Sequence, residues 1–240
     1  MRKLIHRFWG GDPMPDDYVE YGVRWQELNP DWTVVEWRTE HDDTSYVGSA
    51  LDVTKVINSD VWKSINIPPP GMQIDNVAMW TQRADVVSYE ILYNYGGLYV
   101  NTDIEPVRPL TQMFEDAMLE TYPAAAMEDD TWLVNSAMWA PQSGSVFFKE
   151  VIDRLPDRYF LWSGEFMNVT TGPHLLTHVA SYMPIIALDK DVFSHVHWSQ
   201  VPPGGDASFD VDRLPPDAIG IHHWGHRKNQ RSQTSWIGTQ

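Results

Sequence analysis

Residues 75–95 carry the most regular hydrophobic pattern in this chain of 240 residues. Apolar side chains recur there at steps of three or four, which predicts a helix with one buried face. The apolar positions are Val77, Trp80, Ala84, Val87, Ile91 and Tyr95. Gly96 and Gly97 follow and can supply the left-handed residue that ends a helix. Residues 98–104 alternate and are rich in β-branched side chains, so we expect a strand directly after this turn.

Strands and helices are expected to alternate along the rest of the chain. The expected strands are residues 3–9, 32–37 and 132–140, and the expected helices are residues 17–28, 145–155 and 173–183. We expect Pro156 to end the second of these helices. This order predicts an α/β fold with a mostly parallel central sheet flanked by helices. No repeat and no Gly/Ser linker divides the sequence, so we expect one domain over residues 1–240.

The composition excludes several classes of protein. The sequence has no cysteine, which rules out disulfides, thiolate catalysis and metal centres held by cysteine. Its 33 acidic residues exceed the 17 Lys and Arg and give a formal charge of −16, which disfavours binding to long nucleic acids. No run of about 18 apolar residues occurs, so we expect no membrane-spanning helix. The first residues are too polar for a signal peptide, so a cytoplasmic location is expected.

Asp103 lies near the end of the strand expected after Gly97. In an extended strand Tyr99, Asn101, Asp103 and Glu105 point to one side. Because the other side is mostly apolar, we expect this polar side to face a cleft at the carboxyl end of the strand, where α/β sheets bind ligands. Carboxylate oxygens suit a hard divalent cation such as manganese or magnesium. The alternative is a solvated strand end that binds nothing.

The run ADVVSYEILYNYGGLYVNTD, residues 84–103, resembles the signature S-D-x-x-R-Y-x-x-L-Y-x-Y-G-G-x-Y-x-D-x-D of the DXD glycosyltransferases of family 32. That family includes α-mannosyl-, α-galactosyl- and α-N-acetylglucosaminyltransferases and capsular-polysaccharide enzymes, and it is related to the glucosylating bacterial toxins. The resemblance implies a GT-A fold. Its Rossmann-like, nucleotide-binding half would cover residues about 1–110, and the half that presents the acceptor would cover residues about 111–217.

The resemblance also assigns roles within this run. Asp103 matches the aspartate that binds the metal on the nucleotide diphosphate, and Asn101 matches the one that reaches the ribose and the metal's water shell. Asparagine can still form hydrogen bonds there but contributes no negative charge. Asp85 matches the aspartate that holds sugar hydroxyls, and Ser88 replaces the arginine that follows it on the same helical ridge. We expect Asp85, Asn101 and Asp103 to be catalytic. We expect Asp85, Ser88 and Asn101 to contact the donor.

The beginning of the chain resembles the family as well. Residues 3–11, KLIHRFWGG, look like its opening P-K-I-I-H-Q-I-W-x-G, and residues 25–32 look like its W-x-x-L-N-P-x-Y/W. The resemblance places Phe8 and Trp9 at the nucleotide end of the donor pocket, where an indole can stack on a base. The alternative for Trp9 is a tryptophan at the rim of the core. We expect His6 to be buried and structural.

The last 23 residues, 218–240, contain no Asp or Glu and hold three of the nine histidines. The local excess of positive charge suits a diphosphate. His222, Gly225 and Lys228 resemble the H-x-x-G-x-x-K metal and diphosphate motif of other retaining GT-A transferases. We expect His222, and after it His223, to join the DXD carboxylate as metal ligands. The alternative is a disordered basic tail.

Ser235 and Trp236 resemble the closing S-W that packs over the metal and the β-phosphate in family 32 and in the toxins. We expect both residues, together with Lys228, to contact the donor. Residues about 218–240 would then form a lid that excludes water from the donor.

The middle of the chain resembles the family less closely. Asn135 stands where relatives have an N-x-A/S strand, and we expect it to touch the donor sugar or the acceptor. Glu128, Asp129 and Asp130 form a charge run whose simplest interpretation is a solvated loop. The alternative is that this run lines the cleft and orients an acceptor hydroxyl.

Together these features predict a metal-dependent, retaining glycosyltransferase that moves a sugar from a nucleotide-sugar to an acceptor hydroxyl. UDP-sugar is the favoured donor, and Mn²⁺ or Mg²⁺ is the expected cofactor. The acceptor class stays open among saccharides, proteins, lipid head groups and a modified nucleobase. The alternatives are a GDP-mannose-dependent mannosyltransferase and a noncatalytic module that binds nucleotide-sugars. A phosphatase of the haloacid-dehalogenase kind is disfavoured, because Asn101 stands where its nucleophilic aspartate belongs.

Overall fold

The central feature of this computed structural model is a sheet of eight strands. The structure describes residues 2–11, 13–39, 45–48, 54–65, 76–162, 167–202, 205 and 207–225. In spatial order the strands are β4 (Thr54–Lys55), β3 (Ser45–Gly48), β2 (Thr33–Thr39), β1 (Leu4–Gly10), β5 (Gly97–Val100), β8 (Leu133–Ala140), β7 (Ala124–Met127) and β9 (Ile186–Leu188). Six of these strands run in one direction, and β3 and β8 run against them. The predicted α/β class with a mostly parallel central sheet is confirmed.

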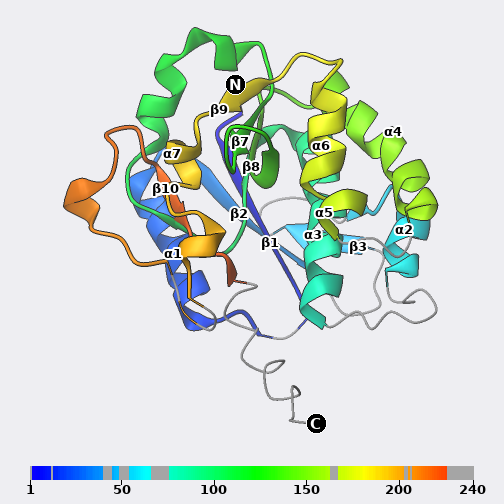
Figure 1. Cartoon of the computed structure of the whole chain (residues 1–240), viewed down its shortest axis with the longest axis horizontal. Helices are drawn as coiled ribbons and strands as arrows, with labels where there is room; N and C mark the ends of the chain where they lie inside the picture. Colours follow the sequence, from blue (N-terminus) through cyan, green and yellow to red (C-terminus); the bar gives the residue numbers. More distant parts are fainter. Residues whose placement is uncertain are drawn as a thin grey trace.

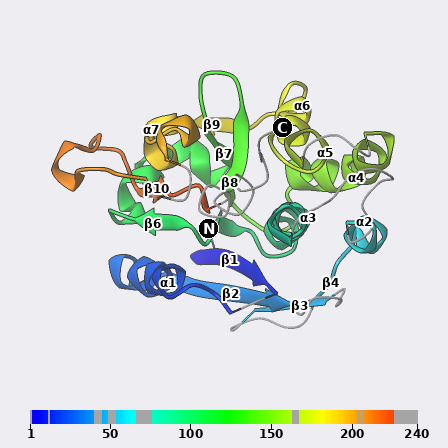
Figure 2. The ribbon, with the colours of Figure 1, turned by 60° about the horizontal axis from the view of Figure 1, so that its bottom comes forward.

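Helices flank the sheet (Figure 1). They are α1 (Asp16–Leu28), α2 (Ser59–Ser64), α3 (Asn76–Tyr95), α4 (Val146–Leu161), α5 (Met167–Thr170), α6 (Pro173–Ala180) and α7 (Lys190–Phe193). Short 3-10 turns cover Leu110–Glu115, Ala117–Glu120, Trp198–Gln200 and Val211–Arg213. A second sheet pairs β6 (Ile104–Pro106) with β10 (Gly220–His222), which lie side by side in Figure 2. No helix among these residues combines the length and the hydropathy needed to cross a bilayer.

Both faces of the central sheet are buried. Tyr99 of β5 packs into the apolar cluster that α3 and α4 cover, whereas its neighbours Leu98 and Val100 pack into the cluster that contains Trp25 of α1. This division follows from the alternation of side chains along a strand. A strand with both sides covered is apolar almost throughout, which explains the composition of residues 97–100.

The turn between α3 and β5 has the predicted form. Gly96 and Gly97 both have positive φ, at +65° and +95°, and a Cβ on Gly97 would lie 2.7 Å from the carbonyl oxygen of Leu4. His6 of β1 fixes this turn, because its Nε2 lies 2.8 Å from the Gly96 carbonyl oxygen while its Nδ1 accepts from the Trp37 indole at 3.1 Å. Burial lowers the pKa of His6 to about 4, so the ring is neutral. The expected structural role of His6 is confirmed.

The predicted single strand over residues 98–104 is wrong. β5 ends at Val100, and the Ile104 amide donates to the Asn101 carbonyl across a turn at 3.1 Å. After this turn the chain pairs with β10 instead of continuing in the central sheet. Tyr99 is 1% exposed in the core, so it does not face a cleft as expected. The turn therefore gives Asn101 and Asp103 surroundings that simple strand alternation did not predict.

The prediction that Pro156 ends a helix is also wrong, since α4 continues to Leu161. Proline lacks the amide hydrogen that would bond the carbonyl one turn earlier, at Ile152. Asn58 supplies a substitute donor, and its Nδ2 lies 3.0 Å from the Ile152 oxygen. A tertiary contact thus replaces the missing helical hydrogen bond.

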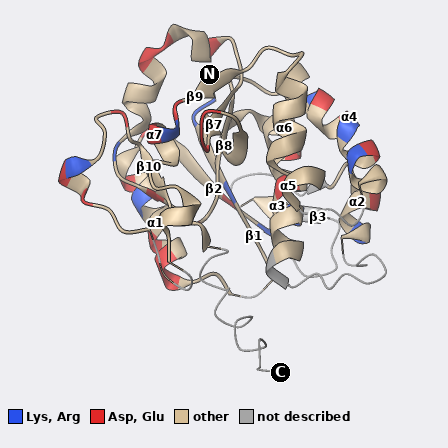
Figure 3. Ribbon diagram, viewed as in Figure 1, with Lys and Arg blue, Asp and Glu red and all other residues tan. Residues whose placement is uncertain are grey.

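Charged residues occur along the outer helices α1 and α4 and also in several loops (Figure 3). α4 carries both signs, and its Lys149–Asp153 and Glu150–Arg154 pairs lie four residues apart. The first turn of α1 carries Asp16 and Asp17, which suit the positive end of a helix dipole. Because α1 follows β1 directly, this acidic turn lies at the edge of the sheet where β1 ends.

Candidate functional site

Asp103 and His222 meet at the end of the β6–β10 ribbon. The His223 amide donates to the Asp103 carbonyl at 3.0 Å, which extends the pairing of β10 with β6. His222 Nε2 then lies 3.2 Å from Asp103 Oδ1, and these side chains are 6% and 14% exposed. The Gly225 amide donates to Asp103 Oδ2 at 2.6 Å. The predicted proximity of Asp103 and His222 is confirmed.

The turn that follows β10 is built around Asp103. Trp224 adopts φ +54°, an unusual conformation for a large side chain, and its ring centroid lies 4.0 Å from that of His222. This conformation directs the Gly225 amide at the Asp103 carboxylate. A Cβ on Gly225 would lie 2.5 Å from the Tyr18 hydroxyl, so only glycine permits the close approach of α1.

His223 is placed away from the Asp103 carboxylate. Its Nε2 lies 3.1 Å from Glu105 Oε2, and its ring stacks on Tyr21 of α1 with centroids 5.4 Å apart. Neighbouring residues of an extended chain point to opposite sides, so the two histidines serve different carboxylates. Of these two histidines, His222 is therefore the one that lies beside the Asp103 carboxylate.

Arg7 supports the turn between β5 and β6, a role that was not predicted from the sequence. Its side chain is fully buried on β1, and Nη2 donates to the Thr102 carbonyl at 2.9 Å and to the Tyr18 carbonyl at 2.6 Å. Nη1 pairs with Glu36 Oε1 at 2.5 Å. Burial lowers the pKa of the Arg7 guanidinium and Glu36 opposes that shift. Its place in the opening motif, where relatives have glutamine, was the only sequence signal.

Asp85 lies on α3 within a closed hydrogen-bonded group. Asn135 Nδ2 donates to Oδ1 at 2.5 Å and the Thr171 hydroxyl donates to Oδ2 at 2.6 Å. Burial raises the pKa of Asp85 to about 7, although both hydrogen bonds oppose the shift. The structure thus brings together the predicted residues Asp85 and Asn135. It adds Thr171, whose Thr-Gly-Pro turn resembles the family but was expected to be structural. Ser88 is fully buried and its hydroxyl donates to the Asp85 carbonyl at 2.8 Å, which leaves it no access to a donor.

The aromatic residues at the end of β1 divide into core and rim. Phe8 is 4% exposed and packs edge-to-face on Trp62, so its predicted contact with the donor is not supported. Trp9 is half-buried and lies edge-to-face with Tyr18, at 5.8 Å between centroids. Asn101 is half-buried, and its main-chain amide donates to the Ser136 carbonyl at 2.7 Å. Trp9 and Asn101 therefore remain accessible at the sheet edge.

The charge run after β7 is not uniform. Asp129 Oδ1 accepts the amides of Thr131 and Trp132, at 2.7 and 3.0 Å, which is a loop-forming contact. The Asp130 side chain is fully exposed, 4.0 Å from Lys190 Nζ. Glu128 differs, because its side chain is only 15% exposed and Oε1 lies 3.5 Å from His197 Nε2. A solvated loop describes Asp129 and Asp130 but not Glu128.

Comparison with known proteins agrees with this arrangement. The family described as "Glycosyltransferase sugar-binding region containing DXD motif" matches residues 15–123, which include Asp85 and Asp103. This part of the chain is therefore similar to the sugar-binding region of the DXD glycosyltransferases. A curated relative, inositol phosphoceramide mannosyltransferase 3 of Schizosaccharomyces pombe, is 27% identical over 202 residues, 83% of this chain and 50% of the relative. The mannosyl phosphorylinositol ceramide synthase CSH1 of Saccharomyces cerevisiae is 26% identical over 183 residues, 74% of this chain and 42% of the relative. The chain thus spans about half the length of the curated relatives it matches.

Solved structures of glycosyltransferases also align with this chain. The PaToxG glycosyltransferase aligns with a TM-score of 0.49 and 13% identity over 74% of this chain and 68% of that chain. The galactosyltransferase LgtC, in complex with donor and acceptor sugar analogs, aligns with a TM-score of 0.45 and 9% identity over 99% of this chain and 97% of that chain. Both TM-scores are below 0.5, so the site is described from its own contacts alone.

The Asp103–His222 pair can be tested for its fit to a divalent cation. Two ligands that bind one ion at about 2.1 Å and at a right angle lie about 3.0 Å apart, and the observed separation is 3.2 Å. His222 Nδ1 is buried and makes no hydrogen bond within the described residues. Those residues hold no group of three or more metal-binding side chains, so the protein would supply two ligands from this region. The predicted donor contacts Lys228, Ser235 and Trp236 lie outside the described residues.

Proposed function

We propose that this chain transfers a sugar from a nucleoside diphosphate sugar to an acceptor hydroxyl. The observation that carries this proposal is the contact between Asp103 and His222. Asp103 belongs to the turn Asn101–Asp103, which matches the DXD motif and is called the DXD turn here, and His222 belongs to β10. The two residues come from segments that each resemble a diphosphate-binding motif, and the fold places them together beside the carboxyl end of β5. Ligands of α/β proteins bind at that edge.

A divalent cation would be held by Asp103 and His222, with diphosphate oxygens completing its ligands. The ion would act as a Lewis acid that stabilises negative charge on the leaving phosphate. A nitrogen ligand favours manganese over magnesium, which prefers oxygen ligands. Arg7, through the Thr102 carbonyl, and the Gly225 amide hold Asp103 in position for this role. The position is thus set before the donor arrives, which is a condition for effective electrostatic stabilisation.

Asp85 would face the donor sugar. Its oxygens already accept from Asn135 and Thr171, but each carboxylate oxygen has a second lone pair that a sugar hydroxyl can use. Burial, followed by the charges of Asp85 and Asp103, raises the pKa of the Tyr99 hydroxyl. Both proposed contact residues are therefore close enough to Tyr99 to affect its hydroxyl.

The reaction that we propose retains the anomeric configuration, as the family resemblance implies. The acceptor oxygen bonds to the anomeric carbon on the face from which the diphosphate leaves, and the bond from that carbon to the phosphate oxygen breaks. The acceptor proton passes to the leaving phosphate. Trp9, at the end of β1, would stack on the base of the nucleotide.

UDP remains the predicted nucleotide of the donor. GDP-mannose is the second candidate, because the names of both curated relatives refer to mannosyl transfer. The two donors differ in base and sugar but share the diphosphate, so the Asp103–His222 pair would serve either.

A thermal-shift panel with UDP and GDP, each with and without Mn²⁺, tests binding, and mass spectrometry of the matching nucleotide-sugars tests transfer. We expect one nucleotide to raise the melting temperature only when Mn²⁺ is present, because binding to the native state stabilises it. We also expect the corresponding nucleotide-sugar to be hydrolysed or transferred. Binding without any turnover would support the noncatalytic module, and the absence of binding to either nucleotide would contradict the proposal.

A further inference from the structure

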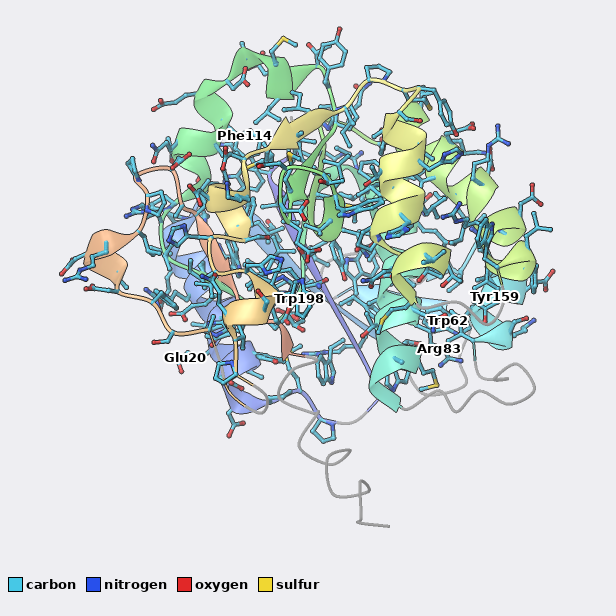
Figure 4. The ribbon with its side chains drawn as sticks, viewed as in Figure 1. Glu20, Trp62, Arg83, Phe114, Tyr159 and Trp198 are labelled. Atoms are coloured by element: carbon cyan, nitrogen blue, oxygen red, sulfur yellow. The ribbon has the colours of Figure 1, made fainter. Side chains whose placement is uncertain are left out.

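Trp198 is an anchored and partly exposed aromatic residue on the acceptor-side half. It opens the short turn Trp198–Gln200, and 39% of the residue is exposed. The segment that leads into this turn is held at Val196, whose carbonyl accepts the Trp224 indole at 2.7 Å. Figure 4 shows Trp198 near the middle of the face that the view presents, between the side that carries α1 and the side that carries α3. The indole is thus carried on an anchored segment while part of its surface stays open to solvent.

His197 and Glu128 complete a polar frame around this indole. His197 caps the turn: its Nδ1 accepts the Ser199 amide, and its own main-chain amide donates to Gln200 Oε1 at 2.9 Å. Its Nε2 lies 3.5 Å from Glu128 Oε1, and its ring centroid lies 5.2 Å from that of Trp198. Glu128 therefore connects the loop after β7 with the turn that carries Trp198. The turn that carries the indole is thus held through His197.

This frame adjoins the proposed diphosphate site. Burial raises the pKa of Glu128, and the nearby His197 and His222 oppose that shift. Trp224 makes the structural link, because its indole donates to the Val196 carbonyl at 2.7 Å and its ring centroid lies 4.0 Å from that of His222. The segment that carries Trp198 therefore packs beside the Asp103–His222 pair. A ring that rests on Trp198 would therefore lie close to where the diphosphate leaves.

We propose that Trp198, Glu128 and His197 form the subsite for a neutral, polyhydroxylated ring of the acceptor. Such a ring has an apolar face of C–H groups, which packs on an indole, and an edge of hydroxyls, which suits a carboxylate and an imidazole. The Glu128 carboxylate disfavours an anionic group at this place. The proposal deepens the proposed function, since it assigns the class of acceptor for the same reaction. The ring could belong to a saccharide or to a cyclitol, because both share this chemistry.

Saturation-transfer NMR on the full chain tests the subsite directly. The probes are methyl α-D-mannopyranoside and, in a separate arm, myo-inositol, at millimolar concentrations that suit weak ring binding. Each is measured with and without Mn²⁺ and the nucleotide that binds. The variants are Trp198→Ala and Trp162→Ala. Trp162 is the matched control, because it is 47% exposed at the end of α4 and packs on Arg158, away from Glu128.

We expect saturation transfer to the ring protons of at least one probe in the wild type and in Trp162→Ala. The signal should fall at least about fivefold in Trp198→Ala and recover in part in Trp198→Phe, which keeps an aromatic face. The arm that responds identifies a saccharide or a cyclitol ring. No transfer to either ring in the wild type, or equal signals in the two alanine variants, would overturn the subsite.

Nucleotide binding is read separately from the same samples by thermal shift. Trp198→Ala should keep the Mn²⁺-dependent shift of the wild type, because the diphosphate contacts are unchanged. A lost ring signal with this shift intact supports the subsite. A wild type that binds neither nucleotide contradicts the proposed function, whatever the ring signal shows. If the nucleotide no longer raises the melting temperature of Trp198→Ala, the indole binds the donor. That result would overturn the acceptor subsite.

Discussion

Arg7 Nη2 donates to the Thr102 carbonyl at 2.9 Å, so a fully buried guanidinium on the first strand holds the centre of the DXD turn. Thr102 lies between Asn101 and Asp103, and a shift of its carbonyl would move both. Gly22 of α1 makes room for this arrangement, because a Cβ there would collide with Arg7 Nη1 and lie 2.7 Å from Glu36 Oε1. The position of Asp103 therefore depends on packing between β1, β2 and α1.

Arg7→Gln is the first test of this dependence. The variant leaves Glu36 without its buried partner and the Thr102 carbonyl without its donor, so we expect the free energy of unfolding to fall by about 2–4 kcal/mol. Because Asp103 loses its support, Mn²⁺ affinity measured by calorimetry with nucleotide present should fall by about 10–100-fold, as for other outer-shell partners. Arg154→Gln removes only an exposed helical pair and serves as the control. A destabilised Arg7→Gln that binds Mn²⁺ like the wild type would show that Arg7 is purely structural.

Asp103→Asn tests the proposed metal ligand itself. The amide keeps the size of the side chain and can still accept from the Gly225 amide, so the fold should survive. Loss of the negative charge should reduce Mn²⁺-dependent nucleotide affinity by more than about 100-fold, beyond the effect of an outer-shell partner. Asp130→Asn is the control, because the Asp130 side chain is fully exposed. Unchanged Mn²⁺-dependent affinity in Asp103→Asn would refute the assignment of Asp103 to the metal.

The two adjacent histidines should respond differently to substitution. His222→Ala removes the imidazole beside Asp103, and we expect it to lower Mn²⁺ affinity more than stability. His223→Ala removes the partner of Glu105 and the stacking contact with Tyr21, so it should cost about 1–3 kcal/mol of stability with little change in Mn²⁺ affinity. Chemical denaturation and Mn²⁺ titration of both variants separate the two roles. Equal losses of Mn²⁺ affinity would mean that both imidazoles bind the ion.

Much of the fold could be predicted from local patterns. The helix α3, its glycine end and the strand β5 follow one another in sequence, so periodicity and turn chemistry are enough to find them. The contact between Asp103 and His222 was predictable only through the resemblance of two distant motifs, since no local rule links them. His222 contacts Asp103 and His223 contacts Glu105, and this difference depends on the register of β10 on β6. The sequence did not reveal that register.

The roles of other site residues could not be assigned from local patterns. Arg7 reads as one polar residue inside an apolar strand, and Thr171 as one residue of an ordinary turn. Each acquires its role from a partner that the fold brings close: the Thr102 carbonyl for Arg7 and the Asp85 carboxylate for Thr171. The same holds for Pro156, whose effect on α4 is offset by Asn58. Tertiary hydrogen bonds decided these positions, and neither propensity nor periodicity encodes them.

The buried Glu90 provides a prediction about pH. This α3 residue accepts the amides of Ile57 and Asn58, at 2.8 and 2.9 Å, where the chain enters α2. Burial raises the pKa of Glu90 from 4.5 to about 7 although both hydrogen bonds oppose the shift, so the folded chain favours the neutral carboxyl. The folded state then binds more protons than the unfolded state between these two pH values. The contribution of Glu90 to stability is therefore largest below pH 4.5 and is lost as the pH rises through about 7.

Glu90→Gln should remove this dependence, because glutamine does not ionise, while its Oε1 can still accept one of the two amides. The difference in free energy of unfolding between the wild type and Glu90→Gln should shift against the wild type as the pH rises from about 4.5 to 7, and then level off. Asp85 has a similarly raised pKa but is present in both proteins, so its contribution cancels in this difference. Urea denaturation of both proteins across this range is the measurement. Curves that stay parallel would show that Glu90 ionises at an ordinary pH in the folded chain, and that the entry to α2 tolerates a buried charge.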